Sequence, residues 1–354
     1  MARIALFGAD VEFAAALREA LALRGVGPSE LHASLAAASD GEGDDEIADD
    51  DEAGRWLADA PLRDLSDLPE VEIAVVVGDP AGREPLLAAA ADAGVILIDA
   101  TDVGPESGVF LVLAGSRAET LADVEPGARV ALPTPAAVGL LGALDPIAAL
   151  SPLVRVVVTV LRPATLRGAA AARELSRQAV ELLGGRALEP AEHPRALAFG
   201  LRPVVVGEND PSPSALLSAE VRTLLGVDAP LVSVSMVDVG VFAGLGLAVY
   251  LETERPLDLQ EVAEALRCTE GVCLAGEFPS AGEGAETEGR VALLADLEPG
   301  PVQVAGSPVL HVAGLEADLA IPGALRFFLS FDERLQGRVV PLADVLVRLL
   351  ERDD

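Results

Sequence analysis

The sequence contains no lysine, and all 25 of its basic residues are arginines. This absence excludes catalysis through a lysine Schiff base and the phosphate-binding lysine of a P-loop. Cysteine is scarce as well: Cys268 and Cys273 are too few for a disulfide framework or a four-cysteine zinc site. We expect these thiols to form a buried pair. Aromatic residues make up 3% of the chain, so its core must consist mainly of alanine, valine and leucine.

Long uninterrupted hydrophobic runs are also missing. The most apolar stretch, 130–154, is divided by four prolines, which a membrane-spanning helix tolerates poorly. The chain starts with Met1-Ala2-Arg3 directly before an apolar strand pattern, without the features of a signal peptide. We therefore expect a cytoplasmic protein of about two domains that does not bind membranes.

Acidic charge is what the sequence has in excess, with 57 acidic residues against 25 basic ones and a net charge of −32. Such a surface repels nucleic acids and anionic lipids, so neither is an expected partner. The densest acidic segment, 40–52, holds nine carboxylates in 13 residues and is expected to be a solvated loop. A patch that binds a partner protein is the alternative. Adaptation to salt or a G+C-rich genome would account for the acidic bias without any functional role.

The N-terminal third of the chain alternates between strand and helix patterns. Helical spacing of apolar residues is found at 11–23, and a second helix is expected to end near residue 93. Apolar runs predict strands at 3–8, 30–37, 71–77 and 95–99. Repeated β-α-β units of this length predict a doubly wound parallel sheet.

The pattern changes after Ser151. Segment 154–161 is predicted to be a strand, and segments 231–242 and 245–254 alternate between apolar and polar residues, as half-buried antiparallel strands do. A terminal helix at 340–352 is expected to return to the first domain. The Gly- and Glu-rich segment 281–289 is expected to be a loop. Further helices are expected at 168–185, 211–226 and 257–269.

Several phrases of the sequence occur in the same order in one known family. VEIAVVVGDPAGREPLLAAAADAGVILIDAT (71–101) resembles the family's second cofactor-side unit, and ALAFGLRPVV (196–205) is similar to its A-F-N-x-x-P segment. Residues 232–266 resemble its V-x-V-F-x-G-H-S strand and the helix after it, while FDERLQGRVV (331–340) is similar to its D-N-L-x-K-G turn. By these phrases the chain resembles the aspartate-semialdehyde dehydrogenases over nearly its whole length, as a divergent paralogue.

The resemblance implies an α/β fold, with a Rossmann-type doubly wound parallel sheet plus an α+β dimerisation domain that has a mixed or antiparallel sheet. It assigns the dinucleotide-binding-type domain to 1–135 with 326–354, and the semialdehyde-dehydrogenase-like dimerisation domain to 136–325. It also implies a homodimer of an amino-acid biosynthesis family. Members use NADP to reduce an acyl phosphate to an aldehyde through a thioester on a cysteine, assisted by a histidine.

The two catalytic positions of the family carry other residues in this chain. The nucleophilic cysteine should follow the strand at 130–132 in a phrase like N-P-N-C, where this chain has Pro135. If the alignment with the family phrase is shifted by one residue in either direction, the cysteine position falls on Thr134 or Ala136. The histidine of the G-H-S phrase is replaced by Leu245. Proline and leucine supply neither a nucleophile nor a base, so no intact catalytic residue is expected.

The cofactor site is altered as well. The family's opening G-A-T-G-x-V-G reads G-A-D-V-E-F-A at 8–14, which loses the glycines that let backbone approach a pyrophosphate and adds negative charge at a helix N-terminus. No cation follows the second strand to pair with the 2′-phosphate of NADP, and Glu333 replaces the family's nicotinamide-side asparagine. We expect no cofactor to bind; NADP or NAD would serve a functional site. The cofactor-binding positions implied by the resemblance are Gly8, Ala9, Ser34 and Gly78.

Few of the positively charged residues that would bind an anionic substrate in the family are present in this chain. The acyl-phosphate arginine of the family is missing from 99–112, and its E-x-x-K pair is represented only by Glu220 and Arg222. Arg222 and Arg162 are the best remaining anion binders, with ordinary surface arginines as the alternative interpretation. Scattered histidines without acidic companions predict no metal site. These histidines are His32, His193 and His311.

The losses fall at the nucleophile, the base and the phosphate-binding positions. They favour a non-catalytic dimeric homologue, a pseudoenzyme, which keeps the dehydrogenase-like fold and binds an unidentified protein or small molecule in the old cleft. The alternative is an active NAD(P)-dependent semialdehyde dehydrogenase-type oxidoreductase with rearranged catalytic residues, since the fold alone says little about activity. A third hypothesis is a salt-adapted assembly protein whose 40–52 loop carries the interaction.

Overall fold

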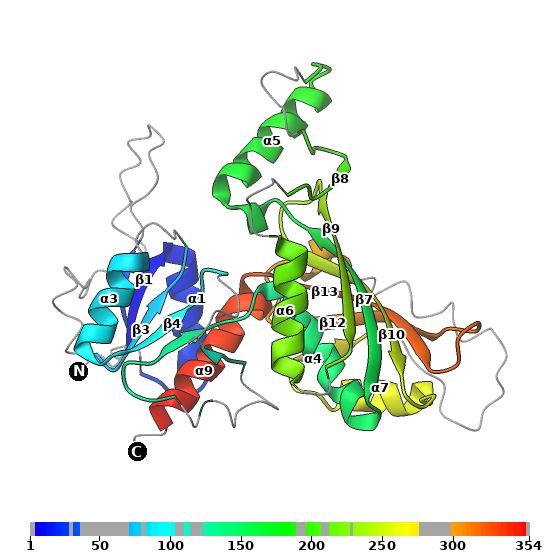
Figure 1. Cartoon of the computed structure of the whole chain (residues 1–354). Helices are drawn as coiled ribbons and strands as arrows, with labels where there is room; N and C mark the ends of the chain where they lie inside the picture. The colour runs from blue at the N-terminus through cyan, green and yellow to red at the C-terminus, as the bar shows by residue number, and fades with distance from the viewer. Residues whose placement is uncertain are drawn as a thin grey trace. The chain divides into compact units, whose positions relative to one another are not determined.

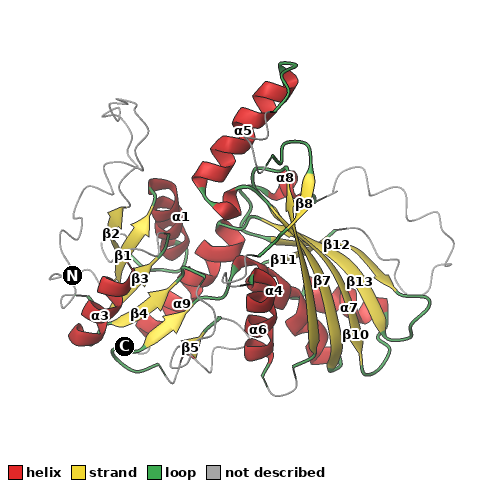
Figure 2. Cartoon of the chain, turned by 45° about the horizontal axis from the view of Figure 1, so that its top comes forward, coloured by secondary structure: helices red, strands yellow, loops and turns green. Residues whose placement is uncertain are grey.

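The chain divides into two compact units, Met1–Thr134 with Arg338–Asp354, and Pro135–Gly337. Figures 1 and 2 show both units in a computed structural model of the protein. Segments 40–52 and 281–289, expected to be loops, lie outside the residues that the structure describes. Those residues are 4–27, 31–35, 71–78, 83–102, 110–113, 121, 124–188, 196–206, 212–226, 229–275 and 299–351.

The first unit is built on a parallel sheet. Within its described residues six strands follow the order β2-β1-β3-β4-β6-β5, and every neighbouring pair is parallel. This confirms the doubly wound sheet predicted from the β-α-β pattern. The strands are β1 (Ile4–Ala9), β2 (Leu31–Leu35), β3 (Ile73–Val76), β4 (Ile96–Asp99), β5 (Phe110–Leu111) and β6 (Arg129–Ala131). The helices are α1 (Val11–Ala22), α3 (Arg83–Ala93) and α9 (Val340–Leu350).

Helix α1 shows why the apolar spacing forms this layer. Phe13, Leu17 and Leu21 recur at helical intervals and are buried, so one face of the helix is turned toward the core. The terminal helix α9 packs on α1. An ion pair between Arg24 and Asp344, with 2.6 Å between Nε and Oδ1, adds a polar contact to this packing. The last helix therefore belongs to the same unit as the first strand, although the two are more than 300 residues apart.

Two glycines shape the ends of β1 and β3. Gly8 has a φ of +76°, and a Cβ there would lie 2.2 Å from the Val77 carbonyl oxygen. Gly78 has a φ of +80°, and its Cβ would lie 2.6 Å from the Gly8 carbonyl oxygen. Both positions require glycine, because the backbones of the two strand ends touch each other.

The second unit holds a mixed sheet. Its seven described strands follow the order β11-β12-β13-β10-β7-β9-β8. They are β7 (Leu153–Arg162), β8 (Leu201–Pro203), β9 (Leu231–Val239), β10 (Leu245–Thr253), β11 (Val272–Leu274), β12 (Leu310–Ala317) and β13 (Ala324–Phe331). The longer helices are α4 (Pro135–Leu150), α5 (Ala169–Leu183), α6 (Pro213–Leu225) and α7 (Leu259–Arg267).

The two faces of this sheet differ. Helices α4, α6 and α7 pack together or on the strands, and α4 and α6 lie on one side of the sheet (Figure 2). On β7 the residues Val156, Val158 and Val160 point to that side and are buried. On the other face Val157 and Leu231 are exposed, and within the described residues no helix covers them. Helix α5 stands away from the sheet (Figure 1).

Several features differ from the sequence-based predictions. Strands β7 and β9 pair in parallel, because β10, which follows β9 in the chain, lies on the opposite edge of β7 instead of forming a hairpin with β9. Residues 326–337 lie in the second unit instead of the first, because β13 is hydrogen-bonded to both β10 and β12. No helix among the described residues is long and apolar enough to span a membrane.

Helix α4 offers a test of the packing in the second unit. A Cβ on Gly139 would lie 2.2 Å from Cε1 of Phe331, whereas one on Gly142 would meet only the end of the Leu310 side chain at 3.0 Å. We expect Gly139→Ala to lower the free energy of unfolding by about 1–3 kcal/mol through overpacking. Gly142→Ala should be neutral or stabilising by up to about 1 kcal/mol, since alanine favours helix. Urea unfolding of both variants measures the difference, and equal midpoints would show that the Phe331 ring moves aside freely.

Candidate functional site

The predicted nucleophile position lies at the start of helix α4. The chain leaves β6 at Ala131 and enters the helix at Pro135, whose side chain is buried. Proline suits the first helical turn because that turn needs no N–H donor. A Cβ on Gly337 would lie 2.6 Å from Cβ of Pro135, so the backbone of Gly337 packs directly on the ring. Packed hydrocarbon occupies this position.

The predicted base position is equally apolar. Leu245 is the first residue of β10, is fully buried, and pairs with Phe331 of β13. The Phe331 ring also lies against Gly139 in α4, and a Cβ on Gly337 would be 3.4 Å from its Cε2. The structure thus brings Pro135 and Leu245 to the surroundings of one aromatic ring. Neither position presents a polar side chain.

Glu333 holds the backbone around these positions. Its buried carboxylate accepts a hydrogen bond from the Gly244 N–H at 2.8 Å and another from the Thr165 hydroxyl. Gly244 has a φ of +94° and immediately precedes Leu245. Thr165 begins the short 3-10 helix η5 (Thr165–Arg167). The carboxylate in the place of the family's asparagine therefore joins the turn before β10 to the segment after β7.

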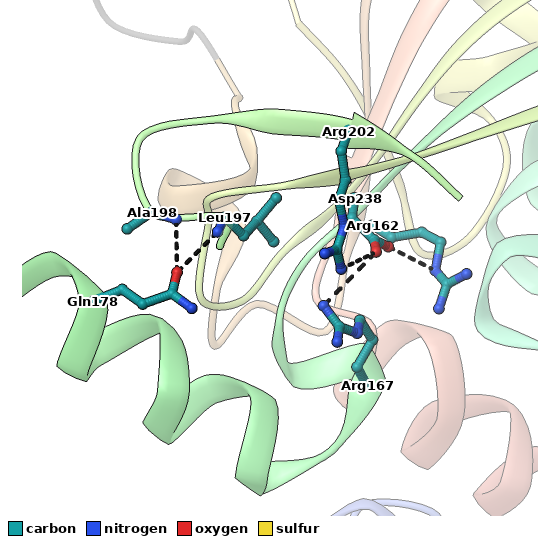
Figure 3. Close-up of polar contacts among 7 residues, drawn as sticks. All are labelled: Arg162, Arg167, Gln178, Leu197, Ala198, Arg202 and Asp238. Atoms are coloured by element: carbon teal, nitrogen blue, oxygen red, sulfur yellow. Dashed lines mark hydrogen bonds and ion pairs between the residues drawn. The ribbon is translucent and has the colours of Figure 1, made fainter. Parts of the chain in front are cut away.

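Four charged side chains meet at the same end of the sheet, on the strands beside the start of β10 (Figure 3). The Asp238 carboxylate, whose side chain is 8% exposed, forms ion pairs with Arg202 at 3.2 Å, Arg162 at 3.6 Å and Arg167 at 3.7 Å. We call these four residues the arginine cluster. Burying a carboxylate costs free energy unless cations or donors surround it, and three guanidinium groups do so here.

The two arginines proposed from the sequence have different surroundings. Arg162 is no ordinary surface arginine, because its side chain is 15% exposed and is paired with Asp238. Arg222 lies exposed in the last turn of α6, while Glu220 of the same helix is buried. Sequence reasoning missed Arg167, Arg202 and Asp238. A signal was present, because Asp238 continues the inward-facing series Val232, Val234 and Met236 and so predicts a buried carboxylate that needs cations.

The phosphate-binding end of α1 is occupied by the protein's own carboxylate. Asp10 is the N-cap of this helix, and its Oδ1 accepts the Phe13 N–H at 2.7 Å. Glu12 adds a second negative charge in the first turn. Gly8 and Gly78 keep their close backbone contact and Ala9 is buried, but Val11 and Ala14 place side chains where glycines are needed for a pyrophosphate. These residues do not fit a dinucleotide phosphate.

The remaining candidates do not form a site. His32 and Ser34 lie on β2, His193 lies outside the described residues, and His311 on β12 has a pKa that burial lowers. The described residues contain no group of three or more His, Cys, Asp or Glu side chains placed to hold a metal ion. The predicted buried pair of thiols is wrong, since Cys268 is exposed just after α7 and Cys273 is half-buried.

The fold and these sites can be compared with known proteins. Residues 144–333 match the family model of the semialdehyde dehydrogenase dimerisation domain. The chain is 31% identical over 188 residues to a USG-1 protein homolog of Pseudomonas aeruginosa, an alignment that covers 52% of this chain and 56% of that protein. It is 26% identical over 269 residues to an aspartate-semialdehyde dehydrogenase of Shewanella sp. (strain DB6705), covering 73% of this chain and 74% of the enzyme.

Solved structures show the same architecture. The crystal structure of aspartate semialdehyde dehydrogenase II from Vibrio cholerae superimposes with a TM-score of 0.76 at 22% identity, covering 99% of this chain and 98% of the other. The enzyme of Candida albicans, solved with NADP, has a TM-score of 0.64 at 13% identity, over 99% of this chain and 98% of the other. The predicted α/β fold, with one parallel and one mixed sheet, is confirmed.

The matched family model spans more than half of the chain. The protein therefore belongs to the semialdehyde dehydrogenase family, as a divergent homologue of the aspartate-semialdehyde dehydrogenases.

The exposed thiol of Cys268 is poorly suited to act as a nucleophile. Cys268 Sγ lies 3.4 Å from Glu264 Oε1, and this hydrogen bond, together with the charge of the carboxylate, raises the pKa of the thiol. Because the thiolate is the reactive form, we expect Glu264→Gln to speed alkylation of Cys268 several-fold at neutral pH in a Cys273→Ser background. Iodoacetamide labelling followed by mass spectrometry measures the rate. Glu261→Gln, which removes the same charge from the same helix, should leave it unchanged, and equal rates in both variants would contradict the assignment.

Proposed function

We propose that the chain is a non-catalytic dimeric member of its family, a pseudoenzyme that keeps the fold and has lost the reaction. The observation that carries the proposal is the buried apolar surroundings of Phe331, in which Pro135 and Leu245 occupy the two catalytic positions. A thioester route needs a nucleophile at the first position and a base at the second. Packed hydrocarbon supplies neither.

The first unit supports the same proposal. Its N-terminal helix is capped by Asp10, and Glu12 increases the negative charge at a point where a pyrophosphate would have to bind. We infer that NADP and NAD bind weakly or not at all, although a relative of this fold was solved with NADP. On this proposal the first unit is a dinucleotide-binding-type domain without its ligand, and the second unit is the dimerisation domain.

An active oxidoreductase with rearranged residues is the second candidate. It is favoured by one observation, the retention of the full two-unit fold across 99% of the chain. Fold retention is compatible with either function, whereas the surroundings of Phe331 bear on the chemistry itself. We therefore prefer the non-catalytic homologue as the proposed function. Its binding partner is a small molecule or a protein.

The uncovered face of the second sheet supports a homodimer. Val157, Tyr250, Ser233 and Phe328 belong to this face by their strand register. Within the described residues the short helix α8 (Pro301–Val304) contacts β13, and no longer helix covers this face. A broad sheet face with exposed apolar side chains is stabilised by burial against a partner. The matched family model is itself a dimerisation domain.

The first test is catalytic. We expect the wild-type chain to show no reduction of NADP with aspartate semialdehyde and phosphate, measured by absorbance of NADPH beside a competent enzyme of the family. Loss of a positioned base alone costs roughly 10²–10⁴ in rate, and loss of the nucleophile removes the covalent route. Pro135→Cys combined with Leu245→His should restore little activity, because the phosphate-binding positions stay altered.

Two outcomes would overturn this proposal in different ways. Wild-type turnover near that of the competent enzyme would mean that another residue carries the chemistry. Activity in the double variant alone would show that the cofactor site still works. Thermal unfolding with NADP, NAD and no ligand separates these outcomes, because tight binding must raise the melting temperature.

The second test concerns assembly. In moderate salt, light scattering should give twice the 36.3 kDa of one chain. Val157→Asp should shift the protein toward the monomer, because it places a charge on the uncovered face. Leu23→Asp makes a similar change at an exposed position of the first unit and should leave the dimer intact. A wild-type monomer, or a dimer unaffected by Val157→Asp, would contradict assembly through this face. Low ionic strength is unsuitable, because the net charge of −32 drives subunits apart.

A further inference from the structure

The turn between β12 and β13 carries exposed apolar side chains. Leu319 is fully exposed, with a relative exposure of 102%, and Ile321 is 44% exposed. In Figure 1 the orange hairpin that ends in this turn extends outward beyond the strands beside it. Single exposed apolar residues are common on protein surfaces, whereas two on one short turn form an apolar tip. We call residues 318–323 the apolar turn.

The apolar turn is held in one conformation by hydrogen bonds. The Asp318 carboxylate accepts the Ala320 N–H at 2.7 Å and the Ile321 N–H at 3.3 Å. The Gly323 carbonyl accepts both the N–H and the hydroxyl of Thr253, each at 2.9 Å, which ties the turn to the end of β10. Because the turn is preformed, little conformational entropy is lost when its side chains pack against a partner.

The apolar turn continues the uncovered face of the second sheet. One ladder row of that face crosses four strands from β7 to β12 and consists of Val157, Tyr250, Arg326 and Glu316. Its last member, Glu316, stands two residues before the turn begins. Burial, the Glu252 carboxylate and the Asp318 carboxylate raise the pKa of Tyr250, so Asp318 lies close enough to act on that hydroxyl. The turn and the row therefore form one continuous surface.

The charged side chains of this surface are paired with each other. Arg326 Nη2 lies 2.7 Å from Glu316 Oε2, and in the next row Arg155 Nη1 lies 3.5 Å from Glu252 Oε1. Each pair joins one cation to one anion, so the pairs add no net charge, in a chain whose net charge is −32. Two copies of such a chain repel each other where carboxylates dominate the surface. A region of paired charges and apolar side chains is therefore suited to contact with a second copy.

We propose that the apolar turn is a dimer arm, which packs Leu319 and Ile321 against the uncovered sheet face of a second copy of this chain. Dimers with a twofold axis use the same surface of both copies, so each turn packs on the face of the other copy. The row from Val157 to Glu316 is the surface on which the partner's turn lies. The arm rests on the proposed homodimer and adds to it the segment that anchors the contact.

The dissociation constant of the dimer tests the arm, measured on the full chain by sedimentation velocity over a dilution series in moderate salt. Leu319→Asp should raise the Kd about tenfold or more, because the added charge would be buried at the contact. Leu319→Ala removes apolar surface without adding charge and should raise the Kd by a smaller factor. The control is Leu23→Asp, the same substitution at an 81% exposed position of the first unit, which should leave the Kd unchanged.

Cross-linking between two differently substituted chains locates the contact. In a background of Cys268→Ser and Cys273→Ser, a chain with Leu319→Cys is mixed with a chain with Val157→Cys and treated with a short bismaleimide. Mass spectrometry of the linked peptides should show cross-links between positions 319 and 157. A mixture of Leu23→Cys and Val157→Cys chains should give none between positions 23 and 157.

The outcomes separate the arm from the homodimer itself. A wild-type dimer whose Kd is unchanged by Leu319→Asp would overturn the arm and leave the homodimer standing. The absence of cross-links between positions 319 and 157 in a dimer would do the same. A Kd raised equally by Leu319→Asp and Leu23→Asp would show that added charge alone opposes association, which also overturns the arm. A wild-type monomer would overturn both the homodimer and the arm.

Discussion

The ring of Phe331 on β13 lies directly against helix α4 at Gly139. Gly139 lets the helix approach the ring, Gly337 packs on Pro135 beside it, and Leu245 is the strand partner of Phe331. Interiors packed at this density do not tolerate an added methyl group without displacement. The packing of the second unit around helix α4 therefore depends on the small residues Gly139 and Gly337, which face the large ring of Phe331. Both family positions for catalytic groups fall within this packed region.

Charge is distributed unevenly across the fold. The chain carries a large negative excess, yet the arginine cluster gathers three cations around one buried carboxylate. Elsewhere buried carboxylates have one cation or backbone donors as partners: Asp99 pairs with Arg129 at 3.1 Å, and Glu333 accepts from Gly244 N–H. A buried charge needs such partners, so each of these contacts contributes to a specific packing. In the arginine cluster three cations surround one buried carboxylate.

Local patterns predicted most elements because local physics determines them. The helical spacing of apolar residues in α1 and the continuous apolar run of β3 both arise because these side chains are buried away from water. Strand neighbours were harder, since alternation in β7, β9 and β10 specifies a face and not a partner. Their order depends on where long connections cross, so the alternation in β9 predicts an antiparallel strand, whereas β9 is antiparallel to β8 and parallel to β7. The arginine cluster escaped sequence reasoning for the same reason, because its members are adjacent only through that register.

The residues at the catalytic positions are better suited to packing than to chemistry. A fully buried leucine contributes roughly 1.5–3 kcal/mol relative to an exposed one, and Leu245 is fully buried against Phe331. An imidazole in the same place would lose hydration, which lowers its pKa and weakens it as a base unless a polar partner accompanied it. The ladder partner of Leu245 on β13 is the apolar Phe331. On the proposal of a non-catalytic homologue, the loss of the reaction and the gain of apolar packing are two consequences of the same substitutions.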